Sequence, residues 1–210
     1  MDAERFTREL PELFDELPRS EHPRDRRFAP ILEQVGGLAR ENNLALINLA
    51  ASLLGPGESY VEVGSYKGLS LIAAMLGNDG DFVAIDSFQM GDGSRELLEH
   101  NVARYSLEGH TILEGDAFEL LPRLDRRIGA YYYDAAHDYE SQLNGLRLAE
   151  PHLVSGALVI VDDTDWERVE RAIDDYLAAQ PRARRLLTID GKDRGQPWWW
   201  EGMQVLVWDG

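Results

Sequence analysis

Short apolar runs alternate with helix-length segments over most of the chain, and this alternation constrains the fold more than any other sequence feature. Near-continuous apolar strands separated by helices are typical of a parallel sheet that is covered on both faces. Five strands are expected, at Tyr60–Val63, Phe82–Ile85, Thr111–Leu113, Ala130–Tyr133 and Ala157–Val161, with helices near 69–76, 94–106, 117–121 and 139–150 between them.

The end of the chain departs from this alternation. A helix is expected over 165–179, and two further apolar runs follow it at Leu186–Ile189 and Gln204–Trp208 with no helix-length segment between them. Such a pair indicates an antiparallel hairpin at one end of the sheet. The predicted fold class is α/β, a doubly wound, mostly parallel seven-stranded sheet with a C-terminal antiparallel hairpin and helices on both faces.

Residues 1–57 are predicted to form an N-terminal helical cap segment ahead of a core over 58–210, within a single domain overall. An amphipathic helix is expected over 3–17, and a helix or helix pair over 31–54, where Gly36-Gly37 is the candidate break.

The chain is strongly acidic. Its 21 Lys and Arg residues stand against 38 Asp and Glu residues, a formal net charge of −17. Such a surface repels phosphate backbones and anionic lipid, so a general nucleic-acid or membrane-surface binder is excluded. No cysteine is present, which excludes thiolate metal sites and thiol nucleophiles. The N-terminal stretch lacks the apolar core of a signal peptide, and a cytoplasmic location is expected.

A glycine turn follows the first expected strand. Its spacing is E-x-G-x-x-x-G, with Glu62 where a dinucleotide fingerprint has its first glycine, followed by Gly64 and Gly68. A carboxylate beside a pyrophosphate is unfavourable, so NAD and FAD are disfavoured and a cationic, phosphate-free ligand is favoured. Asp86 ends the second strand, 22 residues after Gly64, where a carboxylate can accept hydrogen bonds from both ribose hydroxyls.

Over about residues 58–165 the sequence resembles the class I S-adenosylmethionine-dependent methyltransferases, which have a Rossmann-like fold. The run from Glu62 to Gly68 is similar to the first motif of the family, and Asp86 to its ribose-binding acid. The resemblance implies a pocket for S-adenosylmethionine that is lined by Glu62, Gly64, Ser65, Tyr66, Gly68, Ser70, Asp86, Ser87, Phe88, Gly115, Asp116 and Ala117.

Three more carboxylates follow the fourth and fifth expected strands. Asp134 ends one strand and Asp162 and Asp163 end the next. If these strands are neighbours, about 4.8 Å apart, the carboxylates converge and repel one another. A divalent cation (Mg²⁺, or Mn²⁺ or Ca²⁺) resolves the conflict. The alternative is that one Asp caps the helix starting near Trp166 while another pairs with an arginine.

This arrangement resembles the metal-dependent small-molecule O-methyltransferases, most closely the group of the macrolide-sugar enzymes. The resemblance implies that Asp134, Asp162 and Asp163 bind the metal, which lowers the pKa of the acceptor hydroxyl. The family carries a second acid where this chain has Ala136. The identity of the general base is therefore not fixed by the resemblance. His137 is the nearest candidate for this role, and Asp134 is the other predicted catalytic residue.

The leading hypothesis is a methyltransferase that acts on a hydroxyl of a small-molecule acceptor. Alternatives are a cephalosporin-hydroxylase-like oxidative enzyme on the same fold, a non-catalytic nucleotide-binding module and, weakest, an NAD oxidoreductase. A homo-oligomer is a further expectation. Residues 89–95 are expected to form a mobile segment beside the cofactor. Pro197 to Trp200 are expected either to cover the acceptor, to form a subunit contact or to fold onto the sheet edge.

Overall fold

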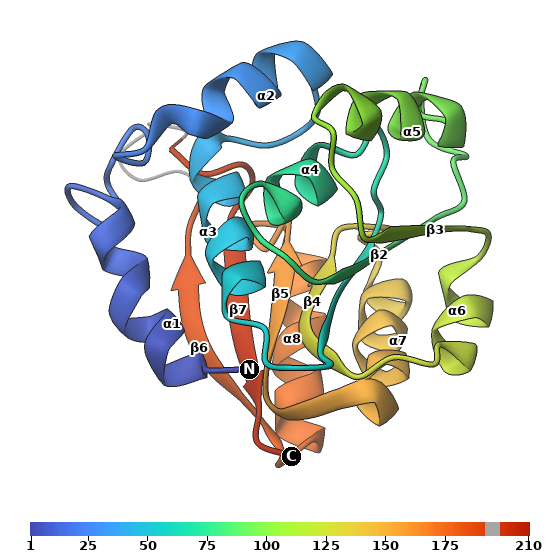
Figure 1. Cartoon of the computed structure of the whole chain (residues 1–210). Coiled ribbons are helices and arrows are strands. Elements are labelled where there is room, and N and C mark those ends of the chain that lie inside the picture. Colours follow the sequence, from blue (N-terminus) through green and yellow to red (C-terminus); the bar gives the residue numbers. More distant parts are fainter. Residues whose placement is uncertain (192–197) are drawn as a thin grey trace.

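The structure, a computed structural model, describes residues 1–191 and 198–210 (Figure 1). Its centre is one seven-stranded sheet in the order β3-β2-β1-β4-β5-β7-β6. The strands are β1 (Ser59–Val63), β2 (Asp81–Asp86), β3 (His110–Glu114), β4 (Ile128–Tyr133), β5 (Leu153–Asp162), β6 (Ala183–Ile189) and β7 (Met203–Trp208).

The sheet confirms the predicted topology. β1 to β5 are parallel, whereas β7 pairs antiparallel with both β5 and β6 and so forms the C-terminal hairpin at one edge. The strand order reverses between β1 and β4, which are paired in parallel with Val63 opposite Tyr133. In a doubly wound sheet, the crevice at the carboxyl ends of such a strand pair is the usual ligand site.

Helices cover both faces of the sheet (Figure 1). The first layer packs on the face that carries Tyr60 and Tyr132, and the second on the face of Val61, Tyr131 and Tyr133, because side chains alternate along each strand. The first layer holds α1 (Ala3–Glu9), α2 (Ala29–Val35), α3 (Glu41–Ser52), α4 (Leu69–Met75) and α5 (Arg95–Arg104), and the second α6 (Ala117–Leu120), α7 (Tyr139–Ala149) and α8 (Glu167–Ala179).

The N-terminal helix is shorter than the predicted 3–17. α1 ends at Glu9 and a 3-10 turn, η1 (Leu10–Leu13), follows it. Pro11 lies inside the predicted span and has no backbone N–H to continue the α-helical hydrogen bonds, which accounts for the change. The predicted break in the next helical stretch is found at Gly36, which ends α2 at a φ of 69°.

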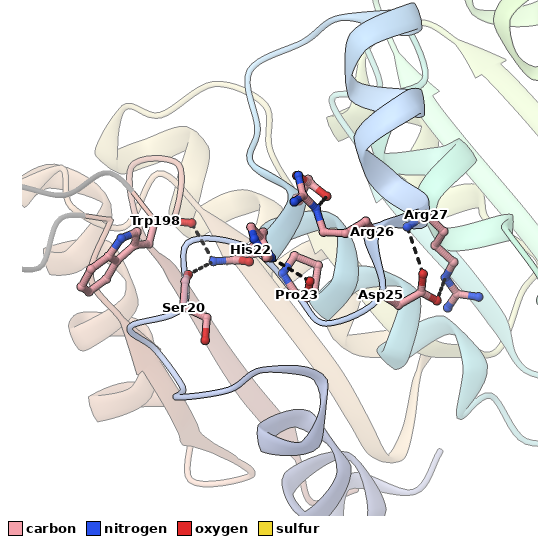
Figure 2. A network of polar contacts seen from close by, with 9 residues as sticks. Ser20, His22, Pro23, Asp25, Arg26, Arg27 and Trp198 are labelled. Atoms are coloured by element: carbon pink, nitrogen blue, oxygen red, sulfur yellow. Dashed lines mark hydrogen bonds and ion pairs between the residues drawn. The ribbon is translucent and has the colours of Figure 1, made fainter.

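The segment around Trp199 packs on the N-terminal part of the chain. The Trp199 ring is 2% exposed, lies 5.5 Å from the Phe14 ring and donates from Nε1 to the carbonyl of Pro18. Figure 2 shows the carbonyl groups of Ser20 and Trp198, both of which accept hydrogen bonds from the Asn42 amide. Trp199 is therefore a core residue that fixes the N-terminal segment. Pro197, part of the same sequence motif, lies outside the described residues.

Within residues 1–191 and 198–210, no helix is both long enough and apolar enough to cross a membrane.

Candidate cofactor and metal site

The glycine turn after β1 brings the ends of three strands together. The Gly64 amide donates to the carbonyl of Ile85 on β2, and the Asp134 amide after β4 donates to the carbonyl of Val63, both at 2.9 Å. Gly64 has a φ of 94°, and a Cβ atom there would lie 1.8 Å from the carbonyl oxygen of Asp134. Only glycine fits this position, since a side chain would force β1 and β4 apart.

Two buried polar atoms at this turn have no hydrogen-bond partner among the described residues. Glu62 is fully buried, and its Oε2 atom accepts a hydrogen bond from the Tyr60 hydroxyl at 2.8 Å, while Oε1 has no partner. The Ser65 hydroxyl also has no partner with good hydrogen-bond geometry, although Ser65 and Ser70 lie near enough to Glu62 to offset part of the rise in its pKa. Burial raises the pKa of Glu62 to about 7. A buried carboxylate oxygen without a donor suits a ligand that brings a cationic or hydrogen-bonding group.

Asp86 is fixed at the end of β2 by backbone donors. Its Oδ2 accepts from the Tyr66 amide and its Oδ1 from the Phe88 amide, each at 2.6 Å. A carboxylate has about four acceptor positions, so each oxygen keeps one for a further donor. This geometry fits the predicted role, in which two vicinal ribose hydroxyls donate to one carboxylate.

The remaining predicted cofactor residues surround Asp86 and the turn. The Gly115 amide donates to the Asp86 carbonyl at 2.9 Å, so the segment after β3 lies beside it. Asp116 is exposed and caps α6 through the Phe118 amide. Ser70 is buried in α4, Ser87 is exposed, and Tyr66, Phe88 and Ala117 are half-buried.

The segment after β2 is attached to the glycine turn. The Asp92 carboxylate accepts from the Tyr66 hydroxyl and pairs with Lys67 Nζ at 2.8 Å. Gly93 packs on the Tyr66 ring, where a Cβ atom would lie 2.4 Å from Cδ2. Asp92 and Gly93, within residues 89–95 that are expected to be mobile, therefore lie against Tyr66.

The three predicted metal ligands meet at the carboxyl ends of β4 and β5. Tyr132 on β4 lies between them: its hydroxyl is 2.6 Å from Asp162 Oδ2 and 3.1 Å from Asp134 Oδ2. One hydroxyl has one proton to donate, so the second contact favours a proton on a carboxyl group. Asp162 is 1% exposed and Asp163 is 7% exposed, and one oxygen of each has no partner among the described residues.

His137 joins this group through its side chain. His137 Nε2 lies 2.8 Å from Asp163 Oδ2 and 3.9 Å from Asp134 Oδ1, and one ligand atom from each of these residues lies within 4.8 Å of the others. Octahedral ligands about 2.1 Å from one cation are about 3.0 Å apart when adjacent and about 4.2 Å apart when opposite. The spacing fits one divalent cation. Asp162, the third predicted ligand, accepts from the Tyr132 hydroxyl with Oδ2 and keeps Oδ1 unpaired among the described residues, but it is not part of the group whose ligand atoms meet within 4.8 Å.

The raised pKa values of two of these carboxyl groups agree with their close approach. Burial, followed by the charge of Asp163, raises the pKa of Asp162 to about 8. Burial and the charges of Asp162 and Asp163 raise the pKa of Asp134 well above its usual range. These groups resist full ionisation side by side, and a cation would displace the protons.

Two tyrosine hydroxyls that bind these carboxylates are not among the residues predicted from the sequence. The Tyr132 hydroxyl joins Asp134 and Asp162, and the Tyr60 hydroxyl donates to Glu62. The available signal was spacing, because Tyr60 precedes Glu62 and Tyr132 precedes Asp134 by two residues. Residues two apart on a strand point to the same face.

Comparison with known proteins gives the class. Residues 61–164, about half of the chain, match the family model described as a methyltransferase domain. TomG, an O-methyltransferase from Streptomyces achromogenes solved in complex with S-adenosylmethionine, superposes with a TM-score of 0.68 at 18% identity over 100% of both chains. An O-methyltransferase from Bacillus cereus in complex with S-adenosylhomocysteine gives 0.67 at 16% identity over 98% of this chain and 99% of that one.

Among curated proteins, one from Sulfurisphaera tokodaii named "Probable cobalt-precorrin-6B C(15)-methyltransferase (decarboxylating)" is 24% identical over 135 residues, which cover 63% of this chain and 67% of that protein. The span that matches the family model, residues 61–164, contains the glycine turn, Asp86 and the Asp134 group. The chain belongs to the methyltransferase-domain family and is a class I S-adenosylmethionine-dependent methyltransferase.

Proposed function

We propose that this protein transfers a methyl group from S-adenosylmethionine to a hydroxyl of a small-molecule acceptor, with the assistance of a divalent cation. The observation that carries the proposal is the convergence of Asp134, His137 and Asp163 at the strand ends that adjoin the glycine turn. The two structural relatives named as O-methyltransferases support the oxygen acceptor.

Different residues would bind different parts of the cofactor. Asp86 would accept the two ribose hydroxyls, with its carboxylate already oriented by the Tyr66 and Phe88 amides. Glu62 and Ser65 offer their unpaired oxygens beside the turn. When bound, S-adenosylmethionine supplies an electrophilic methyl group, and a divalent cation lowers the pKa of a hydroxyl that it contacts.

The acidic group would hold the acceptor oxygen in line with that methyl group. Asp134 and Asp163 would bind the cation, and His137 Nε2 would be either the third ligand or the acceptor of the hydroxyl proton. The methyl group would exchange its bond to sulfur for a bond to the acceptor oxygen, with S-adenosylhomocysteine as the leaving group. The hydroxyl proton would pass to His137 Nε2 or, if His137 is a metal ligand, to water. Most of the rate enhancement would come from orientation and from activation of the hydroxyl.

The test is methyl transfer from labelled S-adenosylmethionine to a panel of catechols and sugars, with Mg²⁺ and with EDTA. Transfer should require the cation, and Asp134→Asn and Asp163→Asn should each abolish it. Full activity in EDTA together with active variants would refute the role of the metal. Oxygen consumption that depends on Fe²⁺, without methyl transfer, would favour the oxidative alternative.

His137→Gln separates the two histidine roles. Loss of Mn²⁺ binding, measured by electron paramagnetic resonance, would mark a ligand. Retained Mn²⁺ binding with loss of methyl transfer would mark the proton acceptor.

A further inference from the structure

A hollow lies beside the acidic group, at the start of α8. It is a shallow hollow of about 520 Å³ that opens to solvent and is lined by Trp166, Glu167, Arg168 and Arg171. Trp166 follows Asp163 by three residues, and its amide donates to the Asp163 carbonyl at 3.1 Å. The hollow therefore adjoins the site at which the proposed function places the acceptor hydroxyl.

The Trp166 side chain forms a fixed aromatic wall. It is 36% exposed, which is unusual for an indole, and yet it is held on two sides. Its ring lies 5.3 Å from the His137 ring at an interplanar angle of 66°, and Nε1 donates to Glu201 Oε2 at 3.3 Å. An exposed aromatic surface that is already ordered costs little entropy when a planar ligand packs on it.

The charges in the hollow are opposite to those of the chain as a whole. Arg168 and Arg171 are exposed, and neither forms an ion pair with any residue that the structure describes. Their guanidinium groups instead lie over aromatic rings, Arg168 over Trp166 at 4.7 Å and Arg171 over Tyr139 at 4.8 Å. Three residues apart, they project from one side of α8. Among the four lining residues, their two positive charges exceed the single negative charge of Glu167, and the Glu201 carboxylate beside the hollow accepts the hydrogen bond of the Trp166 indole.

We propose that this hollow binds the body of the acceptor and selects an aromatic ring that carries a carboxylate. The ring would pack against Trp166, and the carboxylate would pair with Arg168 and Arg171, since guanidinium groups match carboxylates in geometry as well as charge. The hydroxyl would then face Asp134 and Asp163. This inference rests on the proposed function and adds the substrate class to it.

Calorimetric titration tests the inference without relying on turnover. The probes are 3,4-dihydroxybenzoate and its uncharged analogue catechol, each titrated into protein with S-adenosylhomocysteine and Mg²⁺. The wild type should bind 3,4-dihydroxybenzoate about tenfold more tightly than catechol, which corresponds to about 1.4 kcal/mol for the added ion pairing. The double variant Arg168→Gln/Arg171→Gln should abolish the difference, and Arg168→Lys/Arg171→Lys should retain part of it.

Two further variants serve as controls. Arg123→Gln/Arg127→Gln changes the net charge equally, at exposed positions before β4 and so near the amino end of the sheet, and should leave both affinities unchanged. Trp166→Ala should weaken both probes about tenfold, because both lose the aromatic wall. Equal binding of the two probes by the wild type, an unchanged preference in Arg168→Gln/Arg171→Gln or no binding of either probe would overturn the inference.

Failure of this inference and failure of the proposed function give different results. Selective binding that depends on the two arginines, without methyl transfer to any acceptor, would support the hollow as an anion-selective site and refute the transferase activity. Methyl transfer with no preference for the carboxylate would support the transferase activity and refute the hollow as an anion-selective site.

Discussion

Replacing Gly64 with alanine should destabilise the protein more than its positive φ alone explains. A residue with φ near 94° costs about 1–3 kcal/mol when it is not glycine. The Cβ atom would in addition lie 1.8 Å from the Asp134 carbonyl oxygen, so the ends of β1 and β4 must separate. That movement threatens two backbone hydrogen bonds of 2.9 Å, Gly64 to Ile85 and Asp134 to Val63, worth about 1 kcal/mol each. The expected loss is about 3–5 kcal/mol.

Gly36→Ala is the matched control. Gly36 also has a positive φ, 69°, but nothing lies within 4 Å of the Cβ position, so only the backbone strain is added. Urea unfolding of both variants gives the free energies of unfolding in water, and titration with S-adenosylhomocysteine reports the site. Gly64→Ala should be less stable than Gly36→Ala by about 2 kcal/mol and should lose cofactor binding. Equal stability of the two variants would refute the close approach of the strands.

Three further outcomes are expected. Trp199→Ala should lower the free energy of unfolding by about 3–5 kcal/mol, because it empties a buried site against Phe14; a loss under 1 kcal/mol in urea unfolding would contradict this. In EDTA, stability should fall as pH rises from about 5 to about 8, because the folded protein keeps a proton on Asp162 up to its pKa of about 8 that the unfolded chain releases near pH 4; Asp162→Asn should flatten this slope, and an unchanged slope would be evidence against the raised pKa. Asp86→Ala should weaken binding of S-adenosylhomocysteine at least tenfold by calorimetry, since charged hydrogen bonds are worth about 1.5–3 kcal/mol; wild-type affinity would exclude Asp86 from the ribose site.

The buried strands were predictable because their apolar runs leave a strong signal. Where a strand runs past its apolar residues, the signal ends first. β6 begins at Ala183 rather than Leu186, since Arg184 and Arg185 lie exposed on an edge strand. β5 likewise begins at Leu153, before the apolar run at Ala157.

The candidate site was predictable as a set of strand ends but not as a set of contacts. Parallel topology alone brings Asp134 and Asp163 to one edge, so their proximity follows from the order of the strands. The rotamers of His137 and Asp162 depend on packing from other elements. The sequence alone therefore does not indicate that His137 Nε2 approaches Asp163 while Asp162 Oδ2 accepts from Tyr132.

The most direct test of a metal-assisted methyltransferase is a crystal structure with S-adenosylhomocysteine and Mn²⁺, with anomalous data collected for the ion. We predict S-adenosylhomocysteine at the glycine turn with its ribose on Asp86, and a Mn²⁺ peak within about 2.5 Å of Asp134 and Asp163. Bound S-adenosylhomocysteine with no anomalous peak at these carboxylates would contradict the metal-assisted mechanism.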